Sequence, residues 1–274
     1  MPLIRPTNLL LTFDAFGTLF TPKFPIAAQY AFVGQQHGLV GMNEDKVRVA
    51  FKKAFSEESK QHPNYGKSSG MKPEEWWTRV ITNTFTTITS SPLPSSLAPA
   101  LIRRFSSSMG YKLYPEVIPL LHAIRSPPQN WPYSSTTIGV ITNSDPRVTS
   151  VLDSLTVGVR SCIPMIPDHK DKALLDFVTL SYDVGCEKPD IGIFNAARMV
   201  GHQRARGSGA GVWRYVHVGD DLVKDYQGAK SAGWKGVLVD RITKKKLGES
   251  KVIIKGLDEI IEVLINLEKG HCSV

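Results

Sequence analysis

The chain has 274 residues, 42% of them hydrophobic and 9% aromatic, and its 33 Lys plus Arg against 25 Asp plus Glu give a net charge of +8. This apolar content excludes low-complexity disorder and predicts a packed protein of one or two domains. The three cysteines form no CxxC pair, so we expect neither a zinc knuckle nor a disulfide framework.

The N-terminal segment and the basic residues bear on location and partners. The first apolar stretch is interrupted by Asp14, and it is too short and too polar for a signal peptide or a membrane span. We therefore expect a cytoplasmic protein, with the nucleus and the mitochondrion as alternatives, and no membrane partner. The densest basic run lies between Arg241 and Lys255 and lacks interleaved aromatic residues. It predicts a solvated loop, and no nucleic-acid partner is expected.

Five short stretches rich in β-branched and apolar residues predict buried strands, at residues 9–13, 137–142, 177–182, 213–218 and 236–239. Helical patterns follow three of them, at residues 146–155, 189–200 and 222–232. Strands that alternate with helices indicate a doubly wound, Rossmann-like α/β fold with a parallel sheet, whose ligands bind at the carboxyl ends of the strands.

The long segment between the first two strands has helical periodicity instead. Asn43 can cap one helix of this segment, and Pro73 can open another whose apolar stripe includes Trp77. We expect a helical cap domain at residues 22–114 and an α/β core domain at residues 1–21 and 115–274, closed by an amphipathic helix over 257–269.

Chemically distinctive residues follow four of the predicted strands. Asp14 follows the first strand, Thr142 ends the second, Lys188 comes after the third, and an acidic loop from Gly219 to Asp225 follows the fourth. Each residue alone is typical of a cap or a turn. Together, at the edge of a parallel sheet where ligands bind, they favour a site for phosphate and a divalent cation.

These motifs, in this order, resemble the haloacid dehalogenase-like superfamily, whose helical cap matches the insertion. Within it, the segments HPNYG, EEWW and VGDDLVKDYQGAKSAG look most like the haloacid dehalogenase-like hydrolase domain-containing protein 3 group. The resemblance implies a hydrolase: a Mg²⁺-dependent phosphatase of a small phosphorylated metabolite, acting through an aspartyl-phosphate.

The resemblance also implies roles for single residues. Asp14 would be the nucleophile, Thr142 would bond the transferring phosphoryl group, and Lys188 would neutralise its charge. Mg²⁺ would be held by a set of carboxylates and one main-chain carbonyl. This metal set comprises Asp14, the carbonyl of Phe16, Asp220, Asp221 and Asp225.

One residue departs from the phosphatase pattern. The position two residues after the nucleophile holds Phe16, where the phosphatases of this superfamily have an aspartate that acts as acid and base. Loss of such a group costs about 10² to 10⁴ in rate, so we expect weak or specialised activity. Two alternatives remain: a catalytically silent protein that binds a metabolite or a protein partner, and a haloacid dehalogenase, against which the acidic loop at Asp220 argues.

Overall fold

The computed structural model describes residues 7–160, 173–205, 211–242 and 252–269. Its centre is a six-stranded sheet in the order β5-β4-β1-β6-β7-β8, with every strand pairing in parallel. The strands are β1 (Thr7–Phe13), β4 (Ser135–Thr142), β5 (Phe177–Leu180), β6 (Val212–Gly219), β7 (Lys235–Val239) and β8 (Ile253–Ile254). The predicted doubly wound α/β fold is confirmed.

Helices cover both faces of the sheet because side chains of the central strand alternate between them. Leu9 and Leu11 belong to the larger apolar core, which includes residues of α6 (Val117–Arg125), α7 (Arg147–Ser154) and α11 (Ile260–Lys269). Leu10 faces the other way, toward α9 (Ile191–Arg204) and α10 (Gly228–Ser231). A strand buried on both faces requires the continuous apolar run that the sequence shows.

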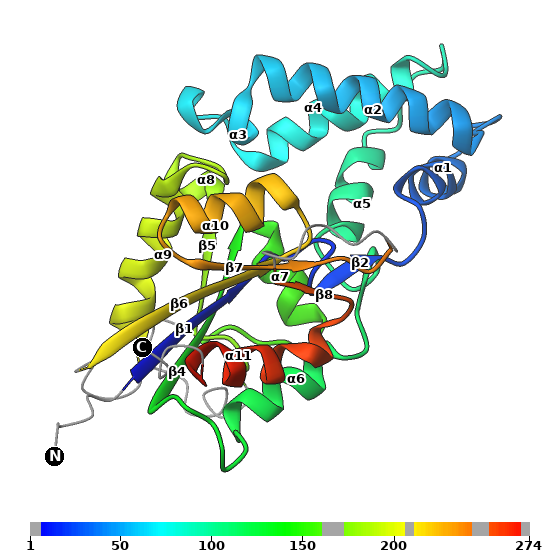
Figure 1. The fold of residues 1–274 in the computed structure, drawn as a ribbon. Helices are drawn as coiled ribbons and strands as arrows, with labels where there is room; N and C mark the ends of the chain where they lie inside the picture. The colour runs from blue at the N-terminus through cyan, green and yellow to red at the C-terminus, as the bar shows by residue number, and fades with distance from the viewer. Residues whose placement is uncertain (1–6, 161–172, 206–210, 243–251, 270–274) are drawn as a thin grey trace, which may run out of the picture.

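The helices encoded between β2 and β3 lie above the sheet, over its carboxyl edge (Figure 1). They are α1 (Ile26–Gln36), α2 (Glu44–Gln61), α3 (Pro63–Gly66), α4 (Pro73–Thr86) and α5 (Leu97–Arg104), with a 3₁₀ turn, η1 (Lys67–Ser69). An antiparallel pair, β2 (Phe20–Pro22) and β3 (Tyr111–Leu113), lies where the chain enters and leaves this layer. Division of the chain into domains at residues 22 and 114 stays a prediction.

The starts of the two longest cap helices follow from local chemistry. The side chain of Asn43 accepts hydrogen bonds from the main-chain N–H groups of Asp45 and Lys46, and so caps α2. Pro73 opens α4, where a missing N–H costs nothing. Trp77, in the predicted apolar stripe, is partly buried and packs against the cap core, and Trp76 is the fully buried tryptophan of that core at 1% exposure.

Two elements differ from their predicted extents. The third core strand ends at Leu180, because the chain turns there into the short helix α8 (Ser181–Val184). The predicted helix over 222–232 begins as a π-helix, η3 (Leu222–Gln227), before α10. π-Turns are frequent at functional sites, and this one carries Asp225.

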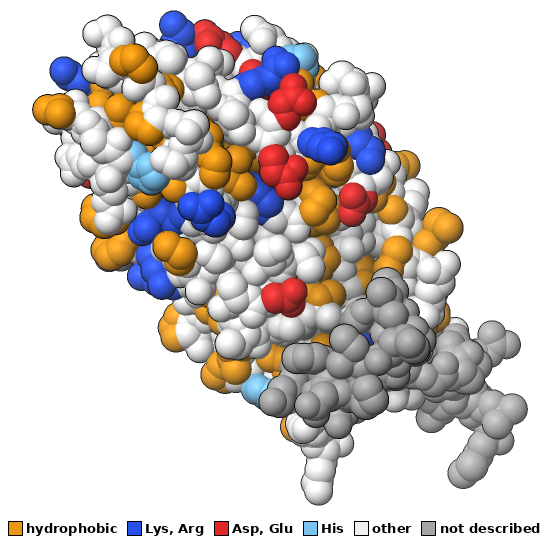
Figure 2. All heavy atoms as spheres, turned by 180° about the vertical axis from the view of Figure 1, so that it is seen from behind, with side chains coloured by type: hydrophobic (Ala, Val, Ile, Leu, Met, Phe, Trp, Pro, Cys, Tyr) orange, Lys and Arg blue, Asp and Glu red, His pale blue; other side chains and the backbone are white. Residues whose placement is uncertain are grey.

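Among the described residues, no helix is both long and apolar enough to cross a bilayer. On the face turned away in Figure 1, basic, acidic and hydrophobic side chains are interspersed (Figure 2). Much of the basic run, at residues 243–251, lies outside the described residues. At its ends, Arg241 pairs with Glu116, and Lys255 lies 3.3 Å from Asp240.

Candidate active site

Asp14 is the first residue after β1 and lies at the carboxyl edge of the sheet. Its main-chain N–H donates to the carbonyl of Val218 at 2.8 Å, which extends the pairing of β1 with β6 by one residue. The residue is only 9% exposed. Burial raises the pKa of this carboxyl to about 7, although the neighbouring ammonium of Lys188 acts to lower it.

Lys188 connects two carboxylates. Its Nζ donates to Oδ1 of Asp14 at 2.6 Å, to Oδ1 of Asp225 at 2.6 Å and to the carbonyl of Ile141 at 2.8 Å. Asn143 fixes the lysine main chain through two hydrogen bonds, one from the Lys188 N–H at 2.7 Å and one to its carbonyl at 2.9 Å. Burial would lower the pKa of Lys188, but the two carboxylates outweigh it, so the ammonium stays charged.

Asp225 is held in place from three sides. It accepts hydrogen bonds from Lys188 and from the main-chain N–H of Asp221 at 2.9 Å, and Nε2 of His217 lies 3.2 Å from it. Burial would raise the pKa of Asp225, but Lys188 and His217 outweigh burial and lower it. Gly219 leaves the necessary space, because a Cβ at this position would lie 2.2 Å from the Asp225 carboxyl carbon.

His217 supports this carboxylate from inside the sheet. Burial lowers its pKa, so we assign the neutral ring with Nε2–H donating to Asp225. Its Nδ1 lies 2.9 Å from the hydroxyl of Thr12. The network therefore runs from β1 through β6 to the acidic loop.

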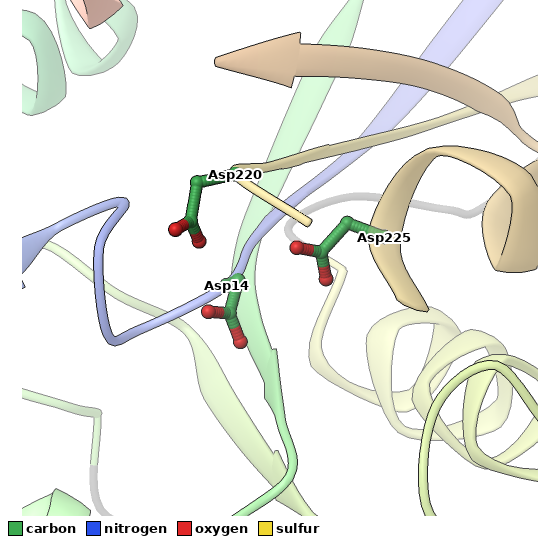
Figure 3. A group of neighbouring side chains, drawn as sticks. All are labelled: Asp14, Asp220 and Asp225. Atoms are coloured by element: carbon green, nitrogen blue, oxygen red, sulfur yellow. The ribbon is translucent and has the colours of Figure 1, made fainter. Parts of the chain in front are cut away.

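The Asp14, Asp220 and Asp225 side chains converge from β1, the end of β6 and η3 (Figure 3). One oxygen of each lies within 4.8 Å of the others. Lys188 supplies one positive charge to these three carboxylates, and burial together with Asp225 raises the pKa of Asp220. Such a surplus of carboxylate oxygen fits a hard divalent cation.

Three further features fit the same ion. Among the described residues, nothing donates a hydrogen bond to the main-chain carbonyl of Phe16. Gly17 has φ +79° and packs so tightly on Asp220 that a Cβ would lie 2.2 Å from its Oδ2. Thr18 donates to Oδ1 of Asp220 at 3.3 Å and orients it. Asp14, Asp220 and the Phe16 carbonyl would be ligands, with Asp225 beside them.

Two predicted site residues lie outside the carboxylate cluster. Thr142 ends β4 and is 1% exposed, and no described residue hydrogen-bonds its hydroxyl. Asp221 does not join the carboxylate cluster, because its side chain accepts from the main-chain N–H groups of Val223 and Lys224 and caps η3. Its place in a metal shell has no geometric support here.

The Phe16 side chain packs into a cluster of aromatic rings and cannot donate a proton. Its ring packs edge-on against Phe20 at 4.7 Å and Tyr111 at 5.5 Å between centroids. No titratable side chain occupies this position, so nothing at this point of the site can act as the acid and base of the phosphatase pattern.

The cap closes over this site through a few polar contacts. Asn64 donates to the carbonyl of Ser181 at 2.8 Å and accepts from its hydroxyl at 2.8 Å. The Tyr65 hydroxyl donates to the carbonyl of Asn143 at 3.1 Å. A cleft of about 290 Å³ remains between cap and core, lined by Asn64, Tyr65, Asn143 and Lys188 among others. The cap thus covers the lysine with room for a small ligand.

Sequence reasoning missed several of these residues. His217 is a lone histidine inside an apolar strand, and that anomaly was its only signal. Asn143 carried no motif of its own, and Asn64 lay in the segment HPNYG without an assigned role. Their roles appear only when distant segments meet. Arg147 also carried no motif of its own, and it is largely buried, with its guanidinium 2.8 Å from Asp145.

The fold and site together define a class, that of parallel α/β proteins with a helical cap over a carboxylate and lysine site. A family model described as haloacid dehalogenase-like hydrolase matches residues 10–233. The chain therefore belongs to the haloacid dehalogenase-like hydrolase family, as its motifs predicted.

Named relatives agree with this assignment. An uncharacterized hydrolase of Schizosaccharomyces pombe is 34% identical over 231 residues, covering 84% of this chain and 90% of the relative. Haloacid dehalogenase-like hydrolase domain-containing protein 3 of Xenopus laevis is 29% identical, covering 96% and 98%. The HAD-hydrolase YfnB of Bacillus subtilis, in a magnesium-bound structure, has the same fold with a TM-score of 0.60 at 16% identity, covering 95% and 99%.

Proposed function

We propose that the protein is a Mg²⁺-dependent phosphatase of a small phosphorylated molecule, acting through an aspartyl-phosphate. The observation that carries this proposal is the buried Asp14, 2.6 Å from Lys188 and within a cluster of three carboxylates. A carboxylate whose pKa is about 7 without a cation is poised to bind one and then to act as an ionised nucleophile.

The reaction would proceed in two displacements. A carboxylate oxygen of Asp14 forms a bond to phosphorus while the phosphorus–oxygen ester bond breaks, and the leaving group takes the electron pair. Water then forms a bond to phosphorus, the bond to Asp14 breaks, and its electron pair returns to the carboxylate. The water protons remain with the released phosphate and alcohol, so the net reaction is hydrolysis.

The surrounding side chains would stabilise the negative charge of the transferring group. Lys188 already lies against the nucleophile and can shift one of its three donors to a phosphoryl oxygen. Thr142 has a buried hydroxyl at the end of the adjacent strand and would donate another hydrogen bond. Bound Mg²⁺ would supply Lewis-acid stabilisation of phosphoryl oxygens and neutralise Asp14 and Asp220. The likeness to magnesium-bound YfnB supports this choice of ion.

Phe16 lowers the expected rate of phosphate ester cleavage. Because a phenyl ring transfers no proton, the leaving group must depart without general-acid help, which ordinarily contributes about 10² to 10⁴ in rate. Substrates with stable leaving anions are therefore preferred.

The test is hydrolysis of an aryl phosphate by purified protein, with and without Mg²⁺, in wild type and Asp14→Asn. We expect Mg²⁺-dependent turnover that falls by at least about 10³ in the variant, because an amide is no nucleophile. Asp153→Asn, an exposed position on α7, is the matched control. Turnover that persists in Asp14→Asn would refute the proposal.

Phe16 also favours a second candidate, a catalytically silent protein that binds a ligand in the same cleft. This reading predicts no turnover in wild type under any of these conditions, together with Mg²⁺ binding that calorimetry still detects.

A further inference from the structure

A second cavity, of about 280 Å³, lies beyond the cleft between the cap helices and the core. Tyr65 and Asn143 line both spaces, so the cavity adjoins the cleft that contains Lys188. Its walls are mainly aromatic and aliphatic side chains from α1, α2, α4 and α5, and Phe16 belongs to the wall on the core side. A substrate with its phosphate at Lys188 would extend its organic part into this cavity.

Arg147 brings a charged group to this otherwise apolar cavity. Its Nε donates to Oδ1 of Asp145 at 2.9 Å and its Nη2 donates to Oδ2 at 2.8 Å. Asp145 also accepts from the indole of Trp77 at 2.9 Å, and the guanidinium lies 4.2 Å from the centre of that ring. The pair is therefore rigid and has no net charge. Nη1 of Arg147 has no hydrogen-bond partner among the described residues.

Two tyrosines, together with Arg147, form the polar corner of the cavity. Tyr30 is 2% exposed and Tyr111 is 7% exposed, and both line the cavity with Arg147. Neither hydroxyl is hydrogen-bonded to another described residue. Burial raises the pKa of both hydroxyls, that of Tyr111 to about 12, although the Arg147 guanidinium acts to lower them. They are protonated donors at neutral pH, and buried polar groups of this kind ordinarily have partners.

The composition of the cavity restricts its ligand. A sugar phosphate has several hydroxyls, each of which loses hydrogen bonds to water and needs a partner in the site, and the apolar walls offer few. A second anionic group would enter a corner where Asp145 already balances Arg147. A flat apolar ring fits the apolar walls, and one neutral hydrogen-bond acceptor on it can accept from the two tyrosine hydroxyls.

Phe16 points to the same class of ligand. A phenol has a pKa of about 10, like tyrosine, whereas water and simple alcohols lie near 16. A phenolate therefore departs with the electron pair of the phosphorus–oxygen bond, without an acid, and takes its proton from water afterwards. The residue that replaces the acid also forms part of the wall that such a ring would contact.

We propose that this cavity is the leaving-group subsite, and that it selects phosphate monoesters of phenols whose ring carries a neutral acceptor such as a carbonyl, which accepts hydrogen bonds from the hydroxyls of Tyr30 and Tyr111. This inference rests on the proposed phosphatase function, and it adds the substrate class.

Binding of non-hydrolysable phosphonates tests the subsite without turnover. By calorimetry on the Mg²⁺-loaded protein, we expect phenylphosphonate to bind at least about 10-fold tighter than methylphosphonate, and 4-acetylphenylphosphonate a further 5- to 10-fold tighter. The double variant Tyr30→Phe with Tyr111→Phe keeps both rings and should abolish the second gain while leaving the first. Equal affinities for the methyl and phenyl compounds, or an acetyl gain that survives in the double variant, would overturn the proposal.

A last comparison separates this inference from the proposed function. 4-Hydroxyacetophenone carries no phosphate and probes the cavity alone, and we expect it to bind wild type more tightly than the double variant. If Asp14→Asn hydrolyses aryl phosphate as wild type does, the phosphatase proposal fails by itself. If turnover depends on Asp14 but glucose 6-phosphate is hydrolysed as efficiently as phenyl phosphate, the inference about the cavity fails by itself.

Discussion

Replacement of Lys188 by methionine should destabilise the protein strongly, because it leaves two buried carboxylates without their shared partner. Lys188 is 4% exposed and its Nζ lies 2.6 Å from both Asp14 and Asp225. At an effective dielectric constant near 20, each contact at that distance corresponds to about 6 kcal/mol of attraction, which the desolvation of the ions largely offsets. Breaking a buried pair on one side costs about 3–5 kcal/mol, and we expect a loss of this size at pH 8.

The loss should shrink as the pH falls. Wild-type Asp14, with its pKa raised to about 7, is mostly protonated at pH 5.5 and attracts Lys188 less. In the variant, Lys188 no longer lowers the pKa of Asp225, so burial raises it. The Asp225 carboxyl then takes up a proton as the pH falls, instead of remaining a buried, unpaired charge. Both effects reduce the difference between the two proteins in acid.

Urea denaturation of the metal-free proteins at pH 8 and pH 5.5 measures this difference. Lys53→Met is the control, because Lys53 is 66% exposed in its side chain and lies 4.0 Å from Glu57, and it should change the free energy of unfolding by about 0.5 kcal/mol or less. A Lys188→Met loss below about 1 kcal/mol at pH 8, or a loss that grows in acid, would refute the reasoning.

Three further predictions concern the metal site and the cap. Protons compete with the cation at Asp14 below its pKa of about 7, so Mg²⁺ should raise the melting temperature more at pH 8 than at pH 6, and an equal rise at both pH values would contradict this. Gly17→Ala should weaken Mg²⁺ binding measured by calorimetry, because the new Cβ would lie 2.2 Å from Asp220. The control is Gly38→Ala, at a similar φ of +83° with nothing within 4 Å. It should lower only the free energy of unfolding, by about 1–3 kcal/mol. Asn64→Gly keeps the positive φ of 48° available but removes the two hydrogen bonds to the core. This variant should raise the KM for an aryl phosphate about 5- to 10-fold. An unchanged KM would show that these contacts do not hold the cap over the substrate.

The sequence predicted the core sheet because its information is local. Strands such as β1 and β4 are continuous apolar runs. Asp14 directly follows its strand, Thr142 ends its own, and Lys188 comes soon after β5 beyond the short helix α8, so the topology carries them to one edge. The motif at Gly219 to Asp225 also has a fixed spacing, and two glycines of the site, Gly17 and Gly219, leave room for the carboxylates of Asp220 and Asp225 that pack on them.

The parts that were not predictable depend on packing between distant segments. The helical stripe of α4 does not tell which of two adjacent tryptophans turns inward, and the structure buries Trp76. Trp77 instead reaches Asp145, which lies 68 positions away in the sequence. The spacing of carboxylates in the acidic loop likewise could not show that Asp221 caps a helix while Asp225 turns back to Lys188.

In the proposed mechanism Asp14 is a working nucleophile, and Phe16 stands where its acid partner would be. Mg²⁺-dependent hydrolysis of an aryl phosphate by wild type, Asp14→Asn and Phe16→Asp tests both parts of this mechanism. We predict measurable turnover in wild type, none in Asp14→Asn, and a rate at least about 10-fold higher in Phe16→Asp, where a carboxyl can again protonate the leaving group. Absence of turnover in wild type, with activity only in Phe16→Asp, would contradict the mechanism and identify a silenced site.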